Sequence, residues 1–116
     1  MLTIIAEIRT HAATEHRQAV LDAFQKITPT VLAEDGCYGY ETLIDHLPAL
    51  EIQTQDPNLI MVLEKWQSTV HLETHMLTAH MQRHFEAIKD GEFKHEVRQF
   101  EKSYDNQQAE QISLMV

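Results

Sequence analysis

Four of the eight histidines lie between positions 71 and 84, and this segment offers the most chemistry in the chain. His71/His75 and His80/His84 are each spaced four residues apart, a spacing that lets either pair chelate a metal ion across one helical turn. On a straight helix with about 100° per residue, His71 and His80 lie about 180° apart, and so do His75 and His84. We therefore expect no metal site here, because the pairs converge only if the helix breaks sharply.

Histidine also suits acid–base chemistry, because it is the side chain most easily poised to accept a phenolic proton near neutral pH. Upstream, Glu64 and Trp66 are two residues apart and share one face of an extended strand. An indole ring can stack on an aromatic ligand, and a glutamate can pair with a cation or orient a histidine. For each of these residues, packing, capping or plain exposure to solvent is the competing interpretation.

Composition excludes several classes of protein. The 116 residues contain 9 lysines and arginines against 18 acids, for a formal net charge of -9, which disfavours binding to nucleic acid and to anionic membrane surfaces. The single cysteine, Cys37, excludes an internal disulfide and a cysteine-based zinc site. No run approaches the roughly 18 apolar residues of a membrane span, and no targeting signal stands out. A cytoplasmic protein is expected.

The first half of the chain predicts a strand, a helix and a second strand. Residues 2–9 are short, apolar and β-branched, as in a strand. A helix follows, with Thr14 as its N-cap and with Pro29 introducing a kink or a restart near Thr28. Its buried face is expected to carry Val20, Phe24, Ile27 and Val31. Residues 37–45 alternate as in a strand.

The connection of residues 46–58 contains Leu47, Leu50 and Ile52, which predicts that part of it packs down. The strand after it, residues 59–66, begins with five residues that are apolar on both alternating faces, so burial on both sides is expected.

The second half predicts a divided helical region and a last strand. Ser68 is a suitable cap for helix over residues 68–88, but this region has apolar stripes on two different sides. A break near Thr78, with Thr78 capping the second piece, explains both stripes. Residues 96–102 are predicted to form a fourth strand, and the alternative is a helix, because Phe93, Val97, Phe100 and Tyr104 also fit helical spacing. The order is that of an α+β, ferredoxin-like βαββαβ domain over residues 1–104. A tail over residues 105–116 follows, and its apolar end is expected either to dock on a partner subunit or to fray.

Seven runs of residues carry a family resemblance over about residues 1–90. They are Leu2–Arg9, His16–Asp22, Pro29–Leu32, Glu34–Tyr40, Glu64–Ser68, His71–His75 and Thr78–Met81. Together they resemble the antibiotic biosynthesis monooxygenase family, and in particular its bacterial quinol monooxygenase branch. The resemblance implies a dimeric α+β barrel, in which two subunits pack sheet against sheet and each holds a pocket between its sheet and its helices.

The same resemblance implies roles for individual residues. It makes His75 the expected catalytic base and His80 the second candidate, and it assigns substrate binding to Trp66, Tyr40, Glu64 and His71. No glycine-rich phosphate loop is present, and the first strand lacks the asparagine expected of haem-degrading members. The resemblance therefore implies no bound metal, flavin or haem cofactor.

The leading functional hypothesis is a cofactor-independent monooxygenase or oxidase that converts small aromatic hydroquinones to quinones with molecular oxygen, working as a homodimer. Fold alone does not determine the reaction. An isomerase that moves a proton on a small carbonyl compound is one alternative, and a non-catalytic dimer that binds a small ligand is another. Oxygen consumption separates the first two, and turnover of any substrate separates both enzymes from the third.

Overall fold

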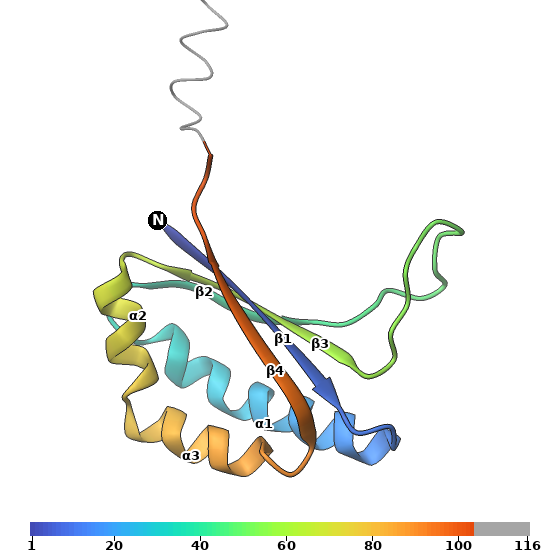
Figure 1. The fold of residues 1–116 in the computed structure, drawn as a ribbon. Helices are drawn as coiled ribbons and strands as arrows, with labels where there is room; N and C mark the ends of the chain where they lie inside the picture. Colours follow the sequence, from blue (N-terminus) through green and yellow to red (C-terminus); the bar gives the residue numbers. More distant parts are fainter. Residues whose placement is uncertain (104–116) are drawn as a thin grey trace, which may run out of the picture.

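The computed structural model describes residues 1–103, so the predicted tail of residues 105–116 lies outside the described residues. Its seven elements are β1 (Leu2–Thr10), α1 (Thr14–Leu32), β2 (Cys37–Leu43), β3 (Leu59–Trp66), α2 (Thr69–Met76), α3 (Ala79–Ile88) and β4 (Glu92–Phe100). The four strands form one antiparallel sheet in the order β2-β3-β1-β4, and the helices lie on one side of it (Figure 1). This confirms the predicted ferredoxin-like α+β fold.

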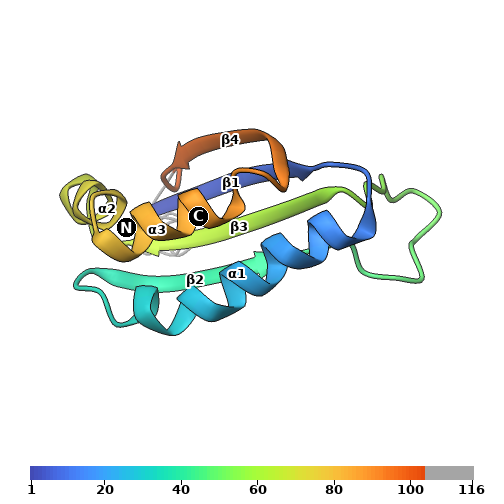
Figure 2. The same cartoon turned by 90° about the horizontal axis from the view of Figure 1, so that it is seen from below.

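The core lies between the sheet and α1. Side chains of β1 and β3 alternate between buried and half-buried, as expected of strands with one covered face. The face of α1 that packs on them is the predicted one, with Val20, Phe24, Ile27 and Val31 buried. Figure 2, seen from below, shows α1 and α3 side by side across the same face of the sheet.

Among residues 1–103 nothing covers the other side of the sheet, and here two predictions were wrong. In β3, Leu59, Met61 and Leu63 are only half-buried, because the helices cover the opposite face alone. In the loop of residues 44–58, Leu47, Leu50 and Ile52 are exposed, because this loop projects beyond the end of the sheet and finds no core beneath it (Figures 1 and 2). We call the uncovered side the open face; its apolar side chains are Ile5, Leu43, Leu59, Met61, Leu63 and Phe100.

Helix α1 differs from its prediction at both ends. The N-cap is Ala13, and Thr14 is the first helical residue. The helix runs through Pro29 without a restart. Pro29 lies in the last turn, where it removes one backbone N–H donor but does not end the helix. The chain then turns at Gly36, whose φ of 77° is in the left-handed region that glycine adopts without strain.

The predicted helix break near Thr78 is confirmed. Helix α2 begins after Ser68, whose hydroxyl accepts a hydrogen bond from the backbone N–H of His71. Helix α3 begins after Thr78, whose hydroxyl accepts one from the backbone N–H of Met81. Each piece therefore has its own side-chain cap, which satisfies backbone donors at the start of a helix.

The last strand begins four residues earlier than predicted, at Glu92. Only Phe93 is apolar among its first four residues, and they lie at an edge of the sheet, so they lack the apolar alternation that marks a half-buried strand. No helix in residues 1–103 is both long and apolar enough to cross a membrane. Location in the cytoplasm stays a prediction.

One buried histidine gives a prediction about stability. His84 is 4% exposed, its ring packs edge-on against Phe24 at a centroid distance of 4.4 Å, and its Nε2 has no hydrogen-bond partner among the described residues. Burial, with smaller contributions from His95 and His75, lowers the pKa of His84 to about 4. Between pH 6.5 and pH 4 the unfolded chain therefore binds a proton that the folded chain does not, so stability falls as the pH falls through this range.

Urea unfolding at pH 7 and pH 5 checks this expectation. The parent protein should lose stability on acidification, and His84→Leu should lose less. The two losses should differ by at most about 3 kcal/mol over the range from pH 6.5 to pH 4. His46→Ala, which removes an exposed loop histidine, should keep the parent's dependence on pH. Equal pH dependence in His84→Leu and the parent would contradict the prediction.

Candidate active site

A cavity of about 790 Å³ lies between the helix-covered face of the sheet and helices α2 and α3. Strands β1 to β4 form its floor, and α2, α3 and Phe24 of α1 form its walls. Most of its lining is apolar: Ile4, Ala6, Phe24, Val62, Leu72, Met76, Leu77, Met81, Phe85 and Val97. A cavity of this size and character suits a small apolar or aromatic ligand.

Three buried groups that can form hydrogen bonds, Tyr40, Glu64 and His75, lie in this apolar lining. Tyr40 and Glu64 come from neighbouring strands, where they are paired directly across β2 and β3. The rings of Tyr40 and His75 are 5.9 Å apart at an angle of 63°. Burial raises the pKa of Tyr40 well above its ordinary value, so its hydroxyl stays protonated and can donate a hydrogen bond.

The ring of His75 is positioned by contacts with Glu34 and Trp66. Its Nδ1 lies 2.6 Å from Oε2 of Glu34, which assigns the ring proton to Nδ1 as a donor to the carboxylate. Its Nε2 is left as the acceptor and lies 3.8 Å from Oε1 of Glu64. The ring also packs on Trp66 at a centroid distance of 4.5 Å. Burial lowers the pKa of His75, opposed by the hydrogen bond and charge of Glu34, so the imidazole is neutral at pH 7.

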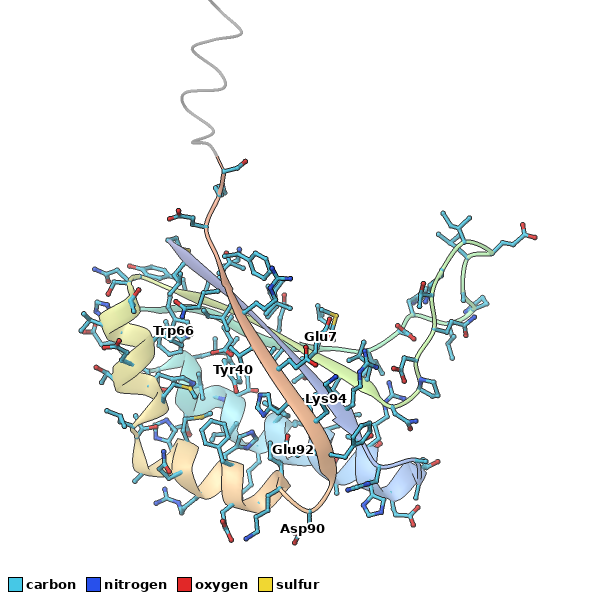
Figure 3. All side chains as sticks on the ribbon, in the orientation of Figure 1. Glu7, Tyr40, Trp66, Asp90, Glu92 and Lys94 are labelled. Carbon is cyan, nitrogen blue, oxygen red and sulfur yellow. The ribbon has the colours of Figure 1, made fainter. Side chains whose placement is uncertain are left out.

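Glu64 is a carboxyl group that titrates near neutrality. Burial raises its pKa to about 7, the hydrogen bond from Trp66 opposes this shift, and the charge of Glu34 adds to it. The indole Nε1–H of Trp66 donates to Oε1 of Glu64 over 3.0 Å. Trp66 is fully buried on the helix-covered side of the sheet (Figure 3) and does not line the cavity, so it acts on the cavity through Glu64 and His75.

With this geometry in place, comparison with known proteins is informative. The sequence model of the family described as "Antibiotic biosynthesis monooxygenase" matches residues 1–87. The chain belongs to this family. It is 51% identical over 89 residues to the protein named "Probable quinol monooxygenase YgiN" of Escherichia coli K12, covering 77% of this chain and 86% of that protein. The protein of the same name from Shigella flexneri gives the same values.

Solved structures agree on the fold. A crystal structure titled antibiotic biosynthesis monooxygenase superposes with a TM-score of 0.74 at 21% identity, covering 90% of this chain and all of that one. PA3566 from Pseudomonas aeruginosa gives a TM-score of 0.72 at 24% identity, covering 89% of this chain and 94% of that one. At these identities the likeness shows the fold alone. The family membership and the YgiN-like relatives together support monooxygenase activity.

The six residues that the family resemblance singled out separate into two groups. Tyr40, Glu64 and His75 line the cavity, and Trp66 lies directly behind it. His80 and His71 do not line it. His80 faces the other side of Glu34 and lines a smaller pocket of about 380 Å³ between α1 and α3.

His71 lies at the start of α2, away from the cavity lining. Its Nδ1 is 2.7 Å from the hydroxyl of Ser68, and its Nε2 is 3.5 Å from the exposed carboxylate of Asp35. Its ring packs so closely on Gly36 that a Cβ at this glycine would overlap it. These contacts describe a side chain that joins α2 to the turn after α1.

Sequence reasoning missed Glu34 as a site residue. It follows α1 in a turn of ordinary composition, and no local pattern distinguishes it from a solvated acid. The structure brings it to α2 because this turn is tied to the end of β3: the backbone N–H of Gln67 donates to the carbonyl of Gly36 over 2.8 Å. His95 of β4 is exposed and also contributes to the cavity lining.

The histidine pairs were expected not to converge on a straight helix, but this segment forms two separate helices, α2 and α3. The break at Leu77 and Thr78 turns His80 back toward Glu34, so that its Nε2 lies 3.1 Å from the same Oε2 atom that His75 contacts. One atom each of Glu34, His75 and His80 can therefore serve as a ligand, and these atoms all lie within 4.8 Å of one another. One member of each predicted pair takes part, and His71 and His84 do not.

Proposed function

We propose that this chain oxidises small aromatic hydroquinones with molecular oxygen and without a bound cofactor. The observation that carries the proposal is the setting of His75, with Glu34 on Nδ1 and a free acceptor, Nε2, toward an apolar cavity large enough for one or two fused rings. A carboxylate that holds the far nitrogen of a histidine orients the ring and stabilises the imidazolium that forms on proton uptake.

In the proposed reaction, Nε2 of His75 accepts a proton from one hydroxyl of the bound hydroquinone. The resulting quinolate is electron-rich enough to pass an electron to oxygen directly. Hydrogen bonds from the hydroxyl of Tyr40, and from the carboxyl of Glu64 when protonated, stabilise the negative oxygen, and the apolar walls exclude water. Transfer of two electrons and two protons from the hydroquinone to oxygen gives the quinone and hydrogen peroxide. If one oxygen atom instead enters a C–H bond of the ring and the other is reduced to water, the product is a hydroxyquinone.

Oxygen uptake tests the proposal. Protein stripped of metal with a chelator is given a panel of chemically reduced naphthoquinones and benzoquinones, and uptake is compared with autoxidation in the absence of protein. We expect saturable oxygen uptake with at least one of them, unchanged by the chelator. Product analysis then distinguishes formation of quinone and hydrogen peroxide from formation of hydroxyquinone and water. Turnover of a carbonyl substrate without oxygen would favour an isomerase instead. Ligand binding without turnover would favour a binding protein.

We also propose that a second copy of the chain covers the open face. The apolar side chains of this face include Ile5, Met61 and Leu63 in the two central strands. Apolar side chains left partly exposed together on one side of a sheet are a typical site of association. Light scattering at micromolar concentration should therefore give a mass of about twice 13.5 kDa. A stable, fully folded monomer at this concentration would contradict the expectation.

A further inference from the structure

We propose that Glu34, His75 and His80 form an inhibitory binding site for a divalent transition-metal ion of the zinc class. The donor atoms are Oε2 of Glu34, Nδ1 of His75 and Nε2 of His80. The carboxylate oxygen lies 2.6 Å from the first nitrogen and 3.1 Å from the second, and all the donor atoms lie within 4.8 Å of one another. The three come from the turn after α1, from α2 and from the first turn of α3.

The donor set matches the ion. Two imidazoles and one carboxylate form a common three-ligand set for zinc, with water completing the coordination. Donor atoms around a tetrahedral zinc ion with bonds of about 2.0 to 2.1 Å lie about 3.3 Å apart, which falls within the spread of distances seen here. The side chains of Glu34 and His80 are 13% and 23% exposed, so an ion can enter from solvent without passing through the cavity.

The environment of His75 favours this site further. A histidine that binds a metal ion typically donates its other ring N–H to a carboxylate or a carbonyl. Oε1 of Glu64 lies 3.8 Å from the Nε2 of His75, on the opposite side of the ring from the proposed ion. In the metal-bound form this carboxylate is placed to accept the Nε2–H of His75. His80 has its Nδ1 directed away from Glu34, where it can carry its own proton.

Binding at this site would block catalysis by changing the tautomer of His75; this consequence, unlike the binding itself, rests on the proposed function. In the free protein the proton is on Nδ1 and the lone pair on Nε2 is available to the substrate. An ion on Nδ1 displaces that proton, and the neutral ring then carries it on Nε2. His75 becomes a donor toward the cavity and cannot accept a proton from the hydroquinone.

Titration with cobalt(II), followed by displacement with zinc, tests the binding without any substrate. Metal-stripped protein should bind one cobalt ion per chain, with the visible absorption of a four- or five-coordinate centre that zinc abolishes. His80→Ala and Glu34→Gln should each weaken binding at least tenfold, whereas His46→Ala should bind as the parent does. If His80→Ala and Glu34→Gln bind cobalt as tightly as the parent, the ion sits on other histidines and the proposal is overturned.

Oxygen uptake in the same titration tests the inhibition. Turnover of the parent should fall at least tenfold as one zinc ion binds and should recover on addition of chelator. His80→Ala, measured against its own metal-free rate, should resist the same zinc concentration. An increase in turnover with zinc would overturn the proposal. If the metal-free protein consumes no oxygen with any hydroquinone, the proposed function fails, and the cobalt titration still decides whether the binding site exists.

Discussion

Replacing His75 with glutamine is expected to lower the rate of oxygen uptake at pH 7 by about 100-fold. Loss of a general base typically costs about 100- to 10,000-fold, and the lower end applies because part of a hydroquinone ionises in water without help. Glutamine is the suitable replacement, since its amide can still donate to the Glu34 carboxylate that accepts from Nδ1 over 2.6 Å. Alanine would leave that half-buried carboxylate without this donor and would confound catalysis with folding.

The control for this variant is His80→Gln. His80 also contacts Oε2 of Glu34, at 3.1 Å, but it does not line the cavity. Its loss should therefore cost much less than the loss of His75. In His75→Gln, raising the pH should recover part of the rate, because the substrate then ionises unaided. Full activity of a folded His75→Gln variant at pH 7 would exclude His75 as the base.

Replacing Glu34 with glutamine is expected to lower the turnover number by about tenfold to 100-fold, a smaller loss than that of the base itself. The amide oxygen can still accept from Nδ1 of His75, so the ring keeps its orientation. The negative charge that stabilises the imidazolium is lost. Because Glu34 does not line the cavity, KM should change much less than kcat, which distinguishes a positioning residue from one that binds substrate.

Asp35→Asn supplies the matched control for Glu34→Gln. It removes one negative charge from the same turn, but the Asp35 side chain is 97% exposed and contacts only the outer nitrogen of His71. Steady-state oxygen uptake with one reduced naphthoquinone gives kcat and KM for both variants. A Glu34→Gln variant with the kcat of the parent would show that the carboxylate has no part in proton transfer.

Local patterns predicted most of the fold. The four-three-four spacing of apolar residues in α1 identified its buried face, and two apolar stripes that one helix cannot hold predicted the break at Thr78. Errors arose where the outcome depends on surroundings that no local pattern records. The apolar run of β3 was expected to be buried on both sides, but the described part of the chain covers only one. The start of β4, with Phe93 as its one apolar residue among the first four, gave no sign of its place at the sheet edge.

The candidate site was predictable only in part, for a related reason. His75, Glu64 and Tyr40 belong to segments that resemble a known family, so sequence alone singled them out. Glu34 lies 41 residues before His75, and only the packing of the turn after α1 against α2 brings the two together. The spacing of the histidines predicted no metal-binding cluster, because that prediction treated residues 68–88 as one straight helix. That assumption disagreed with the break that the apolar stripes had already predicted.

The break between α2 and α3 divides the cavity wall into two parts with separate tasks. Helix α2 holds His75 against Glu34 and Trp66, whereas α3 contributes Met81 and Phe85, which shape the space for the ligand. Substitutions at Met81 and Phe85 can therefore remodel that space while His75 keeps its contacts with Glu34 and Trp66. Over evolutionary time, or in a laboratory library, such a division allows the shape of the ligand space to vary without rebuilding the surroundings of the proposed base.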